Sequence, residues 1–148
     1  MKTNVKQTIV FRKDLLKGDK SIRKGKMCSS VAHASMACLL SMFKKEEIWR
    51  DDTFPSVGTR MSIEFDHNSM LDVWLNGIFT KICLCVEDEK ELLKLYNKVK
   101  KERPDIPCEL ITDCGLTEFN GVPTNTCIGI GPFWSEDIDV FTKDLKLF

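Results

Sequence analysis

Several features that mark other protein classes are missing from this sequence. No apolar run approaches the roughly 20 residues that a membrane-spanning helix needs. The first residues, MKTNVKQTIVFRKD, lack the apolar stretch and the cleavage site of a secretory signal. A helical membrane protein is therefore excluded, and we expect a cytoplasmic protein with no membrane partner.

Metal-binding patterns are absent as well. The seven cysteines form no C-x-x-C pair, and no histidine lies at zinc-ligand spacing from them. Cys83 and Cys85 would share one face of a strand, but two such residues without further ligands are more often small buried apolar residues. We therefore predict no metal site and no cofactor.

Charge of one sign is also lacking, since 22 Lys and Arg residues balance 22 Asp and Glu residues. Composition alone thus gives no indication of a nucleic-acid partner. The distribution differs, because the segment from Arg12 to Lys26 contains seven basic residues against only Asp14 and Asp19. We expect this segment to form a basic loop.

Length and patterning predict a single α/β domain over residues 1–148. A chain of this length buries about 70% of the surface that its unfolded form exposes, which is enough for one core. The expected strands are residues 7–11, 79–86, 107–112 and 126–131, and the expected helices are residues 26–43, 87–103 and a short one with Ser135 as N-cap. Because strands and helices alternate, helices should cover both faces of a sheet. Residues 44–75 are predicted to be an irregular insertion, with a short strand within 61–66 and a helical turn from Met70.

The first predicted helix carries an unusual stripe. At 100° per residue, Lys26, Ser30, His33 and Ala37 fall on one side, with Ser29 beside them. Small polar residues with a cation at one end suit the floor of a site that a large ligand approaches, and a helix N-terminus favours an anion. The alternative is a small-residue helix packed tightly on a sheet, with His33 hydrogen-bonded internally.

A second stretch, TDCGLTEFNGVPTNT, follows a predicted strand. It contains Asp113 just past the strand end, Gly115 to allow a sharp turn, Thr117, and Thr126 at the start of the next strand. Ligands of helix-flanked sheets gather outside the carboxyl ends of strands. The alternative is an Asx-turn with threonine caps, which Asp-Cys-Gly would also form.

Together, these two stretches resemble the archaeal and eukaryotic type of peptidyl-tRNA hydrolase, the type 2 family, which also has bacterial and viral members. The resemblance runs from Gln7 through the helix that begins GK and contains HA, then KICLCV and EDEKELLKLYNKVK, to ITDCGLTEFNGVPTNTCIGIGP and the closing DLKLF. It covers nearly the whole chain apart from residues 44–75. It implies a three-layer α/β/α sandwich with a mixed sheet of about four strands. The implied activity is hydrolysis of the ester between a peptide and the terminal ribose of tRNA.

The resemblance also implies site residues. Those held important in the family fall on Lys26, Asp113, Thr117 and Thr126, with the helix histidine at His33. We assign catalysis to Lys26, His33, Asp113 and Thr117. We assign substrate binding to Gly25, Ser29, Ser30, Gly115, Thr126, Arg12 and Lys24.

The sequence departs from the family pattern at four points. Ser30 and Glu118 stand where glutamines are usual, Leu116 replaces an arginine, and the loop before Thr126 is one residue longer. These departures bear on substrate binding more than on the fold.

With no G-x-S-x-G nucleophile motif, we expect direct attack by water. Either Asp113 or His33 would activate the water, and the sequence leaves this choice open. Lys26 would hold terminal phosphates or the oxyanion, Thr117 and Thr126 would bond the ribose or the peptide carbonyl, and the basic loop would contact tRNA phosphates.

Two other functions remain open from the sequence, a non-catalytic relative that binds tRNA or protein and a deacylase of another acylated tRNA. The sequence also leaves open whether two copies form a homodimer.

Overall fold

The structure is a computed structural model that describes residues 2, 4–18, 21–51 and 55–148. Its elements are β1 (Val5–Arg12), the 3-10 turn η1 (Lys13–Leu16), α1 (Lys24–Leu40), β2 (Lys44–Ile48), β3 (Gly58–Ser62), α2 (Met70–Leu75), β4 (Lys81–Val86), α3 (Glu89–Glu102), β5 (Cys108–Asp113), the 3-10 turn η2 (Phe119–Gly121), β6 (Thr124–Trp134), α4 (Ser135–Thr142) and β7 (Lys146–Leu147). Among the described residues, no helix is long and apolar enough to cross a membrane.

The central sheet is mixed and has the strand order β5-β6-β1-β4-β7. β1 and β4 are parallel, whereas the β1–β6, β5–β6 and β4–β7 pairs are antiparallel. The sheet has five strands rather than the four expected, because Lys146 and Leu147 pair with the edge of β4. A strand of two residues has no periodicity from which to predict it.

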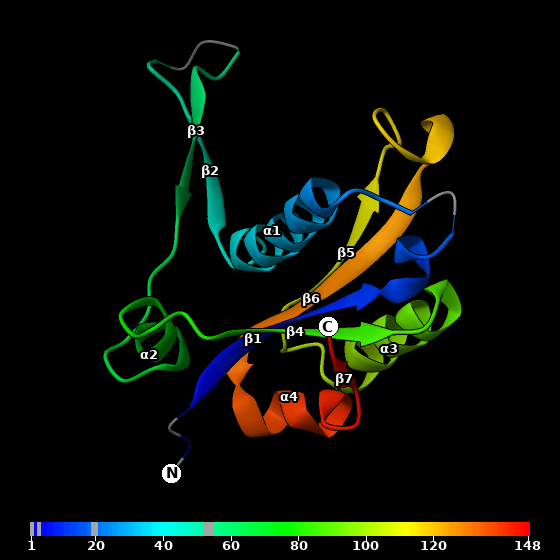
Figure 1. The fold of residues 1–148 in the computed structure, drawn as a ribbon. Helices are drawn as coiled ribbons and strands as arrows, with labels where there is room; N and C mark the ends of the chain where they lie inside the picture. The colour runs from blue at the N-terminus through cyan, green and yellow to red at the C-terminus, as the bar shows by residue number, and fades with distance from the viewer. Residues whose placement is uncertain (1, 3, 19–20, 52–54) are drawn as a thin grey trace.

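Helices cover both faces of this sheet, so the α/β/α layering is confirmed (Figure 1). Successive residues of a strand point to opposite faces. Ile9, Phe11 and Cys127 therefore pack against α1, while Val10 and Ile128 belong to the core on the opposite face. That second core also contains Leu92 and Val99 of α3 and Ile138 of α4.

The first helix lies unusually close to the sheet. Ser30, Ala34 and Cys38 form its buried face. Opposite them on β6 is Gly129, where an added Cβ would lie 2.6 Å from Cys38 Sγ and 2.7 Å from the carbonyl oxygen of Ala34. Small residues on both sides therefore set the height of α1 above the sheet.

The second long expected helix, residues 87–103, is present as α3 at Glu89–Glu102. The Asp88 side chain accepts a hydrogen bond from the backbone N–H of Glu91 at 3.0 Å, and the helix ends at Glu102, two residues before Pro104. The apolar residues on its inner side are buried or pack against the core: Leu92, Leu95, Tyr96 and Val99.

Residues 44–75 contain more regular structure than the irregular insertion expected. β2 and β3 pair as an antiparallel hairpin that extends away from the body (Figure 1). β3 begins at Gly58 and ends at Ser62, earlier than the strand predicted within 61–66. The predicted helical turn is present as α2, and its Trp74 is buried and donates a hydrogen bond to the carbonyl of Thr80 at 3.1 Å.

The last helix corrects one prediction. Ser135 is its first residue rather than its N-cap, because β6 continues to Trp134. The backbone N–H of Ser135 donates instead to the carbonyl of Asn4, at 2.9 Å. Pairing with Asn4 therefore satisfies one of the backbone N–H groups at the start of α4.

The close approach of α1 predicts a steric cost at Gly129. We expect Gly129→Ala to lower the free energy of unfolding by about 1–3 kcal/mol, because α1 must move away from its methyl group. Urea denaturation measures this value. Gly58→Ala is the matched control, since its methyl group would meet no atom within 4 Å. Equal stability of the two variants would contradict the packing constraint.

Candidate functional site

Lys26 and Asp113 meet at the carboxyl end of β5. Lys26 lies in the first turn of α1, and Asp113 is the last residue of β5. The Lys26 ammonium forms an ion pair with Asp113 Oδ2 and also donates a hydrogen bond to Thr117 Oγ1 at 3.4 Å. The two stretches singled out in the sequence are thus brought together in space.

A tight turn after β5 aims the Asp113 carboxylate at the helix. Gly115 has a φ of +77°, and its backbone N–H donates to Asp113 Oδ1 at 2.8 Å. Its carbonyl accepts from the N–H of Gly121 at 2.9 Å, which closes the loop. The Asx-turn considered as the alternative is therefore present and positions one carboxylate oxygen, while the other oxygen contacts Lys26.

The Asp113 carboxyl group has a lowered pKa. Partial burial raises it, but the hydrogen bonds from Lys26 and from the Gly115 N–H, together with the charges of Lys26 and His33, lower it by more. The carboxylate therefore stays charged at neutral pH, and the ion pair is lost only in acid, below the range in which an aspartate ordinarily titrates. Such a group orients neighbours well but accepts protons poorly.

His33 lies two helical turns after Lys26 on the same flank of α1, and it is exposed. Its Nε2 is 3.3 Å from the Ser29 hydroxyl, within hydrogen-bonding distance. It lines a hollow of about 520 Å³, which we call the His33 hollow. The other lining residues are Met36, Ala37, Leu40, Leu110, Ile111 and Thr112. His33 is thus open to a ligand rather than packed in the core.

Two residues expected to contact substrate point into the protein. Ser30 is 1% exposed and Thr126 is 0% exposed. Ser30 lies against β6 with Ala34, and the Thr126 hydroxyl donates to the carbonyl of Ile111 at 3.3 Å. Neither hydroxyl is available to a substrate in this structure. By contrast, Lys24, Gly25 and Ser29 are exposed at the start of α1.

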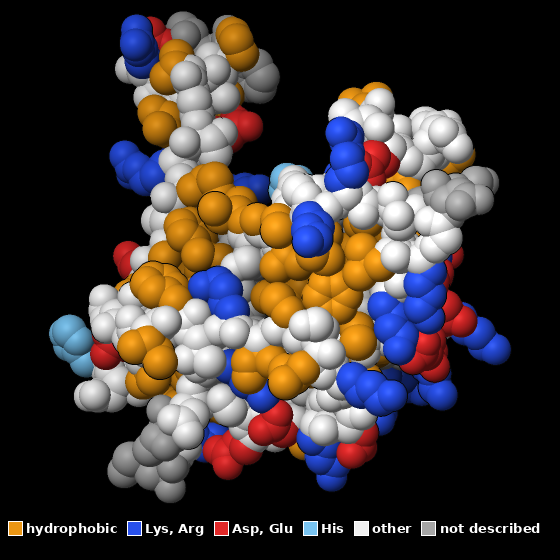
Figure 2. Space-filling model, in the orientation of Figure 1, with side chains coloured by type: hydrophobic (Ala, Val, Ile, Leu, Met, Phe, Trp, Pro, Cys, Tyr) orange, Lys and Arg blue, Asp and Glu red, His pale blue; other side chains and the backbone are white. Residues whose placement is uncertain are grey.

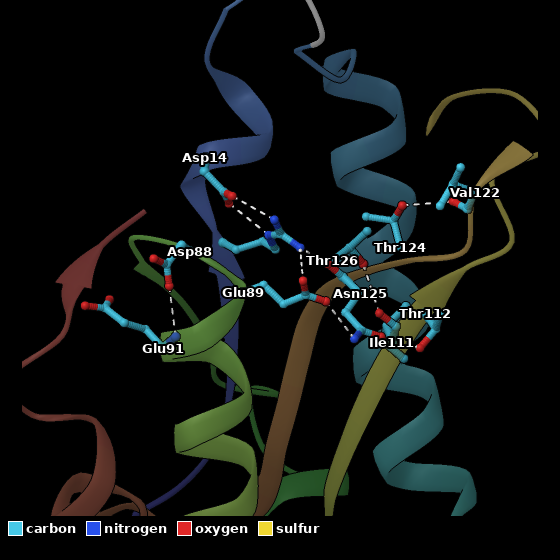
Figure 3. A network of polar contacts seen from close by, with 11 residues as sticks. Asp14, Asp88, Glu89, Glu91, Ile111, Thr112, Val122, Thr124, Asn125 and Thr126 are labelled. Atoms are coloured by element: carbon cyan, nitrogen blue, oxygen red, sulfur yellow. Dashed lines mark hydrogen bonds and ion pairs between the residues drawn. The ribbon is translucent and has the colours of Figure 1, made fainter. Parts of the chain in front are cut away.

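Arg12, another expected substrate contact, is held in an internal network, and its partners Asp14, Glu89 and Asn125 are labelled in Figure 3. Its guanidinium donates to both oxygens of Asp14, at 2.9 and 2.7 Å, and to the carbonyl of Asn125 at 3.1 Å. It also lies 3.5 Å from Glu89, which accepts from the Asn125 amide at 3.0 Å. Arg12 therefore joins the end of β1 to α3 and β6. Asp19 and Lys20 of the predicted basic loop lie outside the described residues.

A second ion pair, between Arg23 and Glu118, was not predicted as part of the site. Glu118 accepts from Arg23 Nε at 2.8 Å and from the backbone N–H of Arg23, the N-cap of α1, at 3.4 Å. This contact ties the loop that carries Thr117 to the start of the helix that carries Lys26. The sequence signal for this contact was the departure at Glu118, where the family pattern has a glutamine.

The described residues contain no group of three or more His, Cys, Asp and Glu side chains that could hold a metal ion. The cysteines that the structure describes are all free. Burial raises the pKa of Cys108 and of Cys127 to about 12, so these thiols are not nucleophiles at neutral pH. The chemistry available here is that of an ammonium, a carboxylate, an imidazole and a hydroxyl.

Known proteins resemble the chain over almost its whole length. A sequence model of the family described as peptidyl-tRNA hydrolase PTH2 matches residues 5–148. A peptidyl-tRNA hydrolase of Methanococcus maripaludis is 35% identical over 141 residues, covering 95% of this chain and 97% of that protein. Those of Staphylothermus marinus and Sulfolobus acidocaldarius are 34% and 33% identical, covering 98% and 97% of this chain and 96% and 99% of theirs.

The turn at Gly115 predicts a large effect of one methyl group. In Gly115→Ala the new Cβ would lie 2.7 Å from the backbone N and O of Val122, at a positive φ. We expect unfolding free energy to fall by about 2 kcal/mol or more, as measured by urea denaturation. Gly121→Ala, at φ +74° with no atom within 4 Å, carries only the backbone cost of about 1–2 kcal/mol. Equal losses would show that the turn is not sterically closed.

Proposed function

The chain belongs to the PTH2 family of peptidyl-tRNA hydrolases, and we propose that it releases peptides from tRNA. The reaction is hydrolysis of the ester that joins the peptide to the 3′-terminal ribose. The observation that carries the proposal is the meeting of Lys26, Asp113 and Thr117, with His33 on the same helix flank, in a chain that matches the family over residues 5–148. A substrate of translation also makes the cytoplasm the proposed location.

Lys26 is the proposed electrophile. Its ammonium is held between Asp113 and Thr117 at the mouth of the site. A fixed cation next to the ester carbonyl stabilises the negative charge that develops on the carbonyl oxygen in the transition state. The Thr117 hydroxyl is exposed and donates to the ribose or to the peptide carbonyl.

His33 is the proposed general base, in preference to Asp113, the other candidate from the sequence. The lowered pKa of Asp113 makes this carboxylate a weak proton acceptor, whereas an imidazole is the side chain best suited to proton transfer near neutral pH. Asp113 instead orients Lys26, and its charge favours the imidazolium that forms during the reaction.

The proposed steps balance as follows. His33 takes a proton from water as the water oxygen attacks the ester carbon, and Lys26 stabilises the resulting oxyanion. The bond between this carbon and the ribose oxygen then breaks. The imidazolium returns the proton to the ribose oxygen, which leaves a free peptide and free tRNA.

Binding of the tRNA is proposed along a groove beside the catalytic residues. This groove of about 690 Å³ lies between the basic loop and the loop after Thr117, and Lys17 and Arg23 line it. Arg23 is 80% exposed despite its pair with Glu118, and Lys17 and Lys24 are exposed. These three cations are the proposed contacts to phosphates near the 3′ end.

Hydrolysis of N-acetyl-aminoacyl-tRNA tests the function and the role of Asp113. We expect wild-type turnover, and a loss of about 100-fold or more in kcat/KM for Asp113→Asn, because Lys26 loses its partner. The exposed Asp144 supplies the matched control, Asp144→Asn, with unchanged kcat/KM. Hydrolysis of unblocked aminoacyl-tRNA at the same rate would indicate a general deacylase, and binding without turnover would indicate a non-catalytic relative.

The pH dependence of kcat/KM tests the base. We expect the wild-type rate to fall toward acid pH, because a general base is inactive once it is protonated. His33→Gln should lower the rate and remove this acid limb, whereas Asp113→Asn should lower the rate and keep it. An acid limb that survives in His33→Gln would assign the base to another group.

Salt and charge substitutions test the tRNA contacts. Lys17→Ala and Lys24→Ala should each raise KM several-fold and reduce the slope of log KM against log salt by about 0.7–0.9. Lys101→Ala is the control, because Lys101 is exposed on α3, on the opposite face of the sheet. A KM that does not respond to salt would contradict phosphate contacts.

A further inference from the structure

A large apolar groove on the other flank of α1 is not used by the proposed reaction. It has a volume of about 580 Å³, and we call it the α1 groove. Its main apolar lining residues are Val31, Met36, Leu39, Trp74, Phe79 and Phe148. Met36 and Phe79 are 56% and 46% exposed, and Figure 2 shows apolar side chains gathered on this face. A concentration of exposed apolar side chains on one face marks a binding surface.

The α1 groove and the His33 hollow are neighbours across the exposed edge of the helix. Met36 lines both of them. Toward the helix start this edge carries the small residues Gly25, Cys28, Ser29 and Ala32, all exposed. A Cβ added at Gly25 would meet no atom within 4 Å, so the space above the edge is open. A chain attached at the reaction site can therefore pass over the helix into the groove.

Resting on the proposed function, we propose that the α1 groove binds the peptide part of peptidyl-tRNA through apolar side chains near its C-terminus. An α-helix is about 10 Å across, and an extended peptide advances about 3.3 Å per residue. About three residues therefore span the edge from the ester to the groove. The groove contacts the side chains of the second and third residues of the peptide, where the residue esterified to the ribose is counted as the first.

The Lys81 ammonium gives the groove a positive charge, which strengthens its preference for apolar over cationic side chains. Lys81 Nζ lies 4.7 Å from the ring centre of Trp74 and 5.0 Å from that of Phe79. It also donates to the Phe79 carbonyl at 3.2 Å. This ammonium stands on the aromatic walls and repels a second cation. Leucine or phenylalanine side chains fit such a groove, whereas lysine or arginine side chains do not.

The test compares acyl groups on one tRNA with one C-terminal amino acid. The substrates are the N-acetyl-aminoacyl form and N-acetyl-tripeptidyl forms with two leucines, two serines or two lysines before the C-terminal residue. We expect kcat/KM about tenfold higher for leucine than for serine, and lowest for lysine. No preference among the tripeptides would overturn the proposal.

Substitutions in the groove wall provide the second arm. Phe79 has a φ of +54°, which asparagine tolerates, so Phe79→Asn removes an apolar wall without backbone strain. The ratio of kcat/KM for the leucine substrate to that for the serine substrate should then fall to about one. The adjacent Ile78, 91% exposed and outside the groove, gives the control Ile78→Asn, which should keep the ratio. A ratio that survives in Phe79→Asn would overturn the proposal.

A second variant guards against a folding defect at Phe79. Ala32 is exposed on the helix edge, so Ala32→Trp places a large side chain in the path without changing the core. We expect it to abolish the leucine preference as well, and an unchanged preference would count against this path.

Sedimentation of the wild type and of Phe79→Asn tests whether a second copy of the chain occupies the groove instead. A dimer that Phe79→Asn dissociates would assign the groove to a second copy and overturn the proposal. Failure of the wild type to hydrolyse even the N-acetyl-aminoacyl form would refute the proposed function itself.

Discussion

The contact between α1 and β6 fixes the geometry on which the site depends. Ala34 and Cys38 approach Gly129 so closely that no side chain fits between them. This places the start of α1 beside the end of β5, where Lys26 can reach Asp113. Ion pairs near the surface contribute little to stability. Packing therefore positions the helix, and the ion pair depends on that position rather than creating it.

The charged residues of the site have different roles. Lys26 keeps Asp113 ionised, and Asp113 in turn holds the ammonium in place beside Thr117. Because this pair is neutral as a unit, the attraction of tRNA depends on cations outside it. Arg12 serves the internal network instead, which leaves Lys17 and Arg23 along the neighbouring groove and Lys24 exposed at the start of α1.

Much of the fold could be predicted because its signals are local. The alternation of Ile9, Val10 and Phe11 follows the two faces of a strand, and the inward side of α3 follows the helical period. β7 pairs with β4, which is distant in sequence, and β2 and β3 are short, polar strands. Local periodicity therefore does not predict these two pairings. The start of α4 likewise depends on Asn4, at the other end of the chain.

The site could be predicted in part for a similar reason. The convergence of Lys26, Asp113 and Thr117 followed from a strand end and a helix start. The buried position of Ser30 was not predicted, because a stripe drawn at 100° per residue includes residues at the boundary between the exposed and the buried flank. Ser30 precedes Ala34 and Cys38 at four-residue spacing, and this pattern assigns it to the packed face.

The plain composition of α1 thus has two separate causes on two sides of the helix. On the inner side, Ser30, Ala34 and Cys38 are small because β6 lies against them. On the outer side, packing imposes no such limit, since Gly25, Ser29 and Ala32 are exposed. An exposed helix edge ordinarily carries long polar side chains, which cost little there. Their absence between the His33 hollow and the α1 groove is explained if a chain must cross at this point, and the proposed peptidyl substrate is such a chain.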